Sequence, residues 1–203
     1  MKRLNVNIEE VNIKGDIDQL SQAVIVIDKA LQSIADNTDK LYSKLMNFQS
    51  TNLGKTYNNI VQTTAELRSE LYYSSAEMND LQRQLIDYQN KLYRYEGINR
   101  SAPSPNKFFV QKRKLSTSTN GFMFSRKDMQ DLIAMIKSFV GSVESNLKNI
   151  VKAKDSASHF WKDRQYKDFS SFIDDVNNKT QRAIKKYEGF IADIDNKVKE
   201  LSE

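Results

Sequence analysis

Apolar residues recur with alternating steps of four and three along almost the whole of this 203-residue chain. The pattern runs through residues 13–48, 53–95, 129–157 and 166–201. Such steps place the apolar side chains on one face of a helix, with the 3.5-residue repeat that is typical of coiled coils. The sequence therefore predicts four long helices and an all-α fold.

Each apolar stripe is wider than the two positions per heptad that a two-stranded coil needs. Extra apolar residues flank the stripe in every segment: Ala23, Val26, Ala30, Val61, Leu132, Phe139, Phe172, Ile184, Ile191 and Val198. A wider stripe requires more than one neighbouring helix. We therefore expect two long antiparallel helical hairpins packed as an elongated four-helix bundle, with helices of roughly 50 to 65 Å. A dimer of hairpin-containing chains would satisfy the same pattern, and the relative orientation of the two hairpins stays open.

A proline-containing segment divides the chain into an N-terminal hairpin (1–98), a linker (99–124) and a C-terminal hairpin (125–203). The linker holds both prolines and an Asn-Gly pair, which interrupt helices. It carries five basic and no acidic residues, whereas the hairpins mix both signs. A candidate contact with an anionic surface, such as a membrane, consists of Phe108, Phe109, Lys112, Arg113 and Lys114. The other interpretation is a solvated linker whose aromatic side chains pack on the helices.

The composition argues against an enzyme. The chain has no cysteine, one histidine and six glycines, and it lacks nucleotide-binding and zinc-protease motifs. We therefore predict no catalytic residues, no small-molecule substrate, no metal site and no cofactor. Nucleic-acid binding is also not favoured, because the long segments carry no continuous basic stripe. No signal peptide or membrane span is evident, so we expect a cytoplasmic protein or one secreted by a non-Sec route.

Polar residues interrupt the apolar stripes at five positions: Thr38, Thr64, Ser74, Lys154 and Thr180. Polar residues at such positions specify register or partner choice at a cost in stability. Gly141 and Gly189 lie inside predicted helices, where glycine is unfavourable relative to alanine. We therefore expect a close helix contact or a kink at each glycine.

The two predicted hairpin turns read FQSTNLGKTYNNI and SHFWKDRQYKDFSSFI. Each places a large apolar residue, Leu53 or Trp161, at the tip and a tyrosine at the start of the following helix. With the GKTY continuation and the opening MKRLNVNIEEV, these turns resemble the WXG and LXG families of type VII secretion, which are helical-hairpin proteins. In those families a Trp-x-Gly or Leu-x-Gly turn joins two antiparallel helices.

The resemblance implies a protein that binds another helical protein, either a secretion partner or a toxin, or that self-associates. It points to Leu53, Gly54, Tyr57 and Trp161 in the two turns as partner-binding residues. Trp161 has a second interpretation, as a cap on its own core. Tyr73 and Glu77 are similar in spacing to the Tyr-x-x-x-Asp/Glu export signal of WXG-type substrates.

We therefore expect a secretion partner, a targeting module or a scaffold. The alternative function is a membrane-surface or coiled-coil scaffold that uses the basic and aromatic linker.

Overall fold

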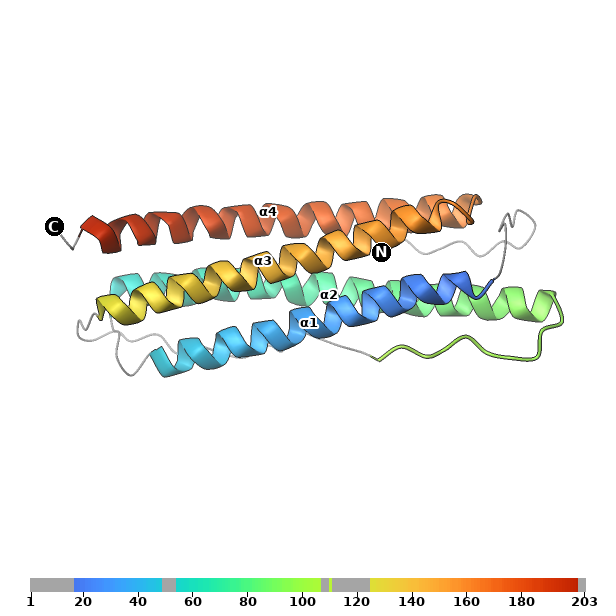
Figure 1. Cartoon of the computed structure of the whole chain (residues 1–203), viewed down its shortest axis with the longest axis horizontal. Coiled ribbons are helices and arrows are strands. Elements are labelled where there is room, and N and C mark those ends of the chain that lie inside the picture. The colour runs from blue at the N-terminus through green and yellow to red at the C-terminus, as the bar shows by residue number, and fades with distance from the viewer. Residues whose placement is uncertain (1–16, 49–53, 107–109, 111–124, 201–203) are drawn as a thin grey trace.

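The computed structural model describes residues 17–48, 54–106, 110 and 125–200. Four helices account for most of them: α1 (Gln19–Phe48), α2 (Lys55–Tyr95), α3 (Arg126–Ala157) and α4 (Arg164–Glu200). They pack as one elongated bundle (Figure 1), which confirms the predicted all-α fold. At 1.5 Å per residue, helices of 30 to 41 residues are about 45 to 60 Å long.

The helices form a four-membered ring in which α1 contacts α2 and α3, and α4 contacts α2 and α3. Within this ring α1 packs most extensively against α3. Figure 1 shows that α1 is antiparallel to α2 and that α3 is antiparallel to α4. The end of α1 and the start of α3 lie at one end of the bundle, whereas the end of α3 and the start of α4 lie at the other. The two hairpins are therefore antiparallel to each other, an orientation that the sequence left open.

The apolar stripes meet in two core clusters, one in each half of the bundle. One cluster includes Leu45, Ile136 and Tyr187, and the other includes Ile27, Leu85 and Ile173. All four helices contribute to both clusters, so neither hairpin has a core of its own. Most of the residues that widen the stripes are buried between helices: Ala23, Ala30, Val61, Leu132, Phe139, Ile184, Ile191 and Val198. These positions explain why each helix contacts two neighbours.

Polar residues in the stripes connect neighbouring helices. Ser74 of α2 and Thr180 of α4 share a hydrogen bond of 2.9 Å between their hydroxyl oxygens. Lys154 of α3 lies 2.6 Å from Asp174 of α4. Thr38 instead donates to the carbonyl of Ile34, within its own helix. The first two contacts fix how α4 is aligned with its neighbours, as expected for polar residues at stripe positions.

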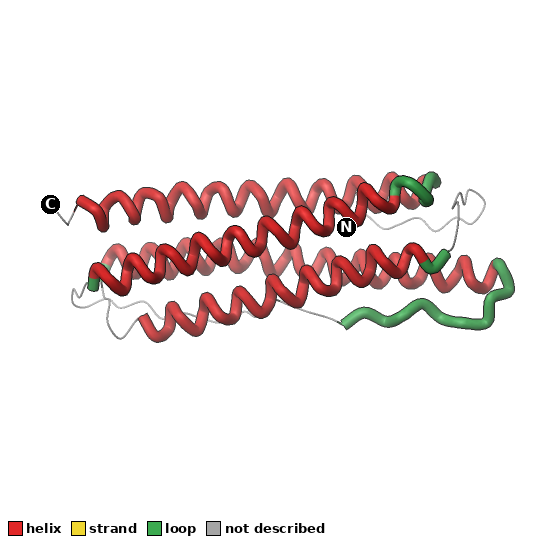
Figure 2. The backbone as a smooth tube through the Cα atoms, in the orientation of Figure 1, coloured by secondary structure: helices red, strands yellow, loops and turns green. Residues whose placement is uncertain are grey.

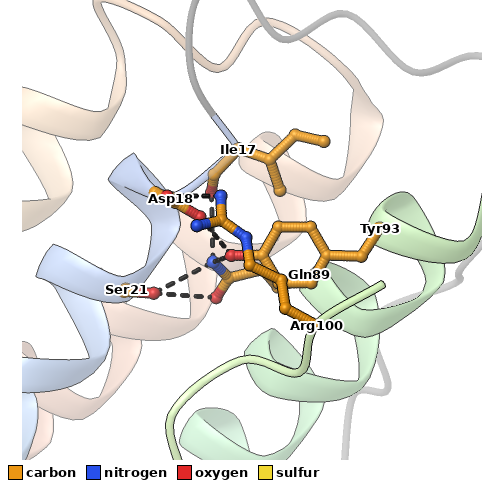
Figure 3. Close-up of polar contacts among 6 residues, drawn as sticks. All are labelled: Ile17, Asp18, Ser21, Gln89, Tyr93 and Arg100. Carbon is orange, nitrogen blue, oxygen red and sulfur yellow. Dashed lines mark hydrogen bonds and ion pairs between the residues drawn. The ribbon is translucent and has the colours of Figure 1, made fainter. Parts of the chain in front are cut away.

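A hydrogen-bond network closes the end of the bundle where α1 begins and α2 ends (Figure 3). The amide of Gln89 donates to the hydroxyl of Ser21 at 2.9 Å and to that of Tyr93 at 2.7 Å. Tyr93 donates to Asp18, which also pairs with Arg100. The hydrogen bond from Tyr93 and the charge of Arg100 outweigh desolvation and lower the pKa of Asp18. Burial and the contact with Asp18 raise the pKa of Tyr93.

The same network attaches the chain that follows α2 to the first hairpin. The guanidinium of Arg100 lies 4.9 Å from the ring centre of Tyr93, a cation–π distance. Further along, the backbone N–H of Ala102 donates to Asn90 at 2.7 Å, and Asn106 donates to Asp28 at 3.2 Å. Figure 2 shows this segment running beside the helices as it turns back along the bundle.

The expectation of close helix contacts at Gly141 and Gly189 is wrong. Both residues are exposed, and a Cβ atom built on either would meet no atom within 4 Å. Glycine at these positions is therefore not needed for helix packing.

We predict that Gly141→Ala and Gly189→Ala each raise the free energy of unfolding by about 0.5 to 1 kcal/mol. The gain comes from the lower conformational entropy that alanine has in the unfolded chain. Denaturant titration followed by circular dichroism measures it. Loss of stability in either variant would show that the glycine is required for the helix geometry. Gly54→Ala is a matched contrast and should destabilise, because the φ angle of Gly54 is 105°.

Candidate functional site

An open groove of 560 Å³ lies between α2 and α4. Its apolar surface comes from Leu67, Ala183 and Tyr187, and the rest is polar or charged: Thr63, Glu66, Ser69, Glu70, Lys179, Arg182 and Lys186. The groove is thus a surface feature with an apolar base and charged sides.

The two sides of this groove carry opposite charge. The α2 side contributes Glu66 and Glu70, and the α4 side contributes Lys179, Arg182 and Lys186. Spacings of three and four residues place each set on one face of its helix. We call these the acidic wall and the basic wall.

Two ion pairs connect α2 to α4 at different levels of the bundle. Lys186 lies 3.1 Å from Glu66, and Lys179 lies 3.8 Å from Glu77. Lys179 also lies 2.7 Å from Asp175, and this hydrogen bond, aided by the charge of Glu77, raises the pKa of Lys179. All these side chains are partly exposed, so the pairs contribute less than about 1 kcal/mol each to stability.

Tyr187 anchors the groove base to the bundle interior. Its hydroxyl lies 2.7 Å from that of Thr64, which also donates to the carbonyl of Ile60 at 2.7 Å. Burial raises the pKa of Tyr187, so the phenol is neutral over the whole physiological range. This contact fixes the alignment of α2 with α4 beneath the two charged walls.

The predicted pair Tyr73 and Glu77 continues the α2 edge of the groove. Residues 63, 66, 70, 73 and 77 follow one another in steps of three and four, so they share a helix face. Tyr73 is 54% exposed, although its ring makes an edge contact with Tyr72 at 5.5 Å. A tyrosine this exposed beside a groove offers a large amphipathic contact surface.

Trp161 lies inside the bundle, with no exposed surface. Its indole stacks on Tyr88 with ring centres 5.5 Å apart and also contacts Phe169. Asp163 follows it and accepts hydrogen bonds from the Tyr88 hydroxyl at 2.7 Å and from the backbone N–H of Tyr166 at 3.1 Å. The indole therefore caps the core, and the interpretation of Trp161 as an exposed docking anchor is wrong for the folded chain.

Tyr57 is also a core residue and not a surface contact. It is 1% exposed, and its hydroxyl donates to the carbonyl of Leu45 at 3.1 Å, which joins the two helices of the first hairpin near the turn. Gly54, with its positive φ angle, is the N-cap residue directly before α2 and adopts a conformation that favours glycine. These two residues shape the turn that the sequence singled out, and burial removes Tyr57 from the candidate binding surface.

Several predicted site residues lie outside the described residues: Leu53, Phe108, Phe109, Lys112, Arg113 and Lys114. The anionic-surface contact therefore stays a prediction. Within the same segment Val110 is described, and it is buried in the core cluster that contains Leu45. At least this part of the linker packs on the helices.

The structure brings together groove residues that belong to none of the sequence motifs described above, namely Glu66, Glu70, Lys179, Arg182 and Lys186. A signal was present in the sequence, because one face of the second helix is acidic and one face of the fourth is basic. Nothing in the sequence showed that these two helices are neighbours.

No protein-family model, curated protein or solved structure matches this chain. In the described ranges, no helix is both long and apolar enough to cross a bilayer. Among the same residues, no group of histidine, aspartate and glutamate side chains is arranged to hold a metal ion.

We predict that Thr64→Val destabilises the bundle more than Tyr187→Phe. The valine variant leaves the buried Tyr187 hydroxyl without a partner, at about 1 to 3 kcal/mol, whereas the phenylalanine variant leaves Thr64 bonded to Ile60. The double variant should cost less than the sum of the two single changes. Chemical denaturation of all four proteins gives this coupling. Strict additivity would mean that the two hydroxyls do not interact.

Proposed function

We propose that this chain is a non-enzymatic interaction module that binds a helical protein, as a secretion partner, targeting module or scaffold related to the WXG and LXG group. The binding surface is the α2/α4 face, which we define as the groove together with Tyr73 and Glu77. Exposure of Tyr73 beside a groove with charged walls is the observation that carries the proposal.

Three further features support this proposal. The described helices form two antiparallel hairpins, the arrangement that the resemblance implies, and Gly54 directly precedes α2 in the Leu-Gly-Lys-Thr-Tyr sequence. Apolar side chains fill both core clusters of the bundle, so a partner protein would bind to the outer surfaces of the helices. Aromatic residues are enriched at interface centres, and charged residues at the rim set orientation and partner choice.

Site-specific photo-crosslinking in cells that produce the chain naturally tests this proposal. A photoreactive phenylalanine analogue replaces Tyr73 in one variant and Tyr95 in another. Tyr95 is a matched control because it belongs to the same helix, is 71% exposed and lies outside the groove. Mass spectrometry then identifies the attached protein.

We expect position 73 to give an adduct with one defined helical protein, either a different protein or a second copy of the chain, and position 95 to give little or none. Glu77→Lys in the position 73 variant should weaken the adduct, because it reverses a charge on the same edge. Equal labelling from both positions, or no adduct from position 73, would contradict the proposed binding surface.

A further inference from the structure

Glu70 and Arg182 face the same groove, but neither forms an ion pair within the described part of the chain. Both side chains are exposed. On either side of their level, α2 and α4 are connected by Lys186 with Glu66 and by Ser74 with Thr180. Because the helices are antiparallel, these two contacts place Glu70 at nearly the same height along the bundle as Arg182.

A surface with one acidic half and one basic half is complementary to a copy of itself under one particular symmetry. A twofold axis parallel to the bundle length keeps every residue at its own height and exchanges the two walls. The acidic wall of one copy then faces the basic wall of the other. A twofold axis across the helices instead places α2 over α2 and α4 over α4, so like charges face one another.

We propose that a second copy of this chain occupies the α2/α4 face, in a parallel twofold dimer in which Glu70 of each copy pairs with Arg182 of the other. This inference rests on the proposed function and names the helical partner of the same face. The charge pattern of the face favours a second copy of the chain as the partner. A partner must carry a basic stripe opposite Glu66 and Glu70. At matching height it must also carry an acidic stripe opposite Lys179, Arg182 and Lys186. The chain itself carries both stripes at those heights.

The dimer has two symmetric Glu70–Arg182 contacts, so each single charge reversal affects the interface twice. In Glu70→Lys both contacts bring two positive charges together, and in Arg182→Glu both bring two negative charges together. When the two variants are mixed, a mixed dimer contains only opposite charges at both contacts. The double variant Glu70→Lys/Arg182→Glu restores opposite charges within one chain.

Sedimentation velocity of the purified full chain over a concentration series tests the inference. We expect the wild-type chain to form dimers that dissociate as salt is raised, because exposed charge pairs are screened. Each single reversal should weaken dimerisation at least about tenfold, and both the equimolar mixture and the double variant should recover it. Circular dichroism checks that each variant is folded, which we expect because both positions are exposed. Matched controls are Asp131→Lys and Lys148→Glu, at exposed α3 positions away from the groove, and these should leave dimerisation unchanged.

Three results would overturn the inference. A wild-type chain that stays monomeric at all concentrations excludes the dimer, and single reversals without effect exclude this face. Recovery in neither the mixture nor the double variant excludes the Glu70–Arg182 pairing. If the chain is monomeric and position 73 still crosslinks to a different helical protein, self-association fails and the proposed function stands. If the chain is monomeric and position 73 gives no adduct, both fail.

Discussion

The whole structure depends on the width of the apolar stripe that each helix must bury. A stripe confined to two positions per heptad is covered by a single neighbouring helix. Residues such as Ala30, Phe139 and Ile191 extend the stripe around each helix and are buried between two neighbours. Four helices in a closed ring satisfy this requirement within one chain, and both core clusters draw on all four. Separation of the two hairpins would expose one side of each apolar stripe to water.

Polar side chains within the apolar stripes determine which residues of neighbouring helices lie at the same height along the bundle. An apolar stripe alone determines which face of a helix is buried. It specifies only weakly how far that helix is shifted along its neighbour. The contacts of Thr64 with Tyr187 and of Ser74 with Thr180 remove this freedom between α2 and α4. A shift by one turn would leave the buried Tyr187 hydroxyl without its Thr64 partner, at a cost of about 1 to 3 kcal/mol. The same alignment places the acidic wall level with the basic wall, so internal register and surface charge are linked.

The sequence predicted those parts of the fold that depend on periodicity. Helix number, helix type and the buried faces follow from spacing alone, and they agree with the structure. The relative orientation of the hairpins did not follow, because a 26-residue linker is long enough for either arrangement. The sequence placed Trp161 and Tyr57 at turns, but it did not show that the neighbouring helices enclose them. The charged walls of the groove depend on which helices are adjacent, and a single sequence carries no direct record of that. The expectation of a close helix contact at Gly141 and Gly189 was wrong because a glycine in a helix interior does not by itself indicate a close neighbour.

Distances between pairs of spin labels test the antiparallel arrangement of the two hairpins most directly. The chain has no cysteine, so pairs of introduced cysteines can be labelled selectively. Lys55, Lys127 and Lys162 are exposed, and labelled chains diluted with unlabelled protein report distances within one chain. Because Tyr88 contacts Asp163, the 55–162 pair spans most of α2, and we expect about 50 Å for it and a much shorter distance for the 55–127 pair. A short 55–162 distance with a long 55–127 distance would contradict the arrangement of the bundle described above.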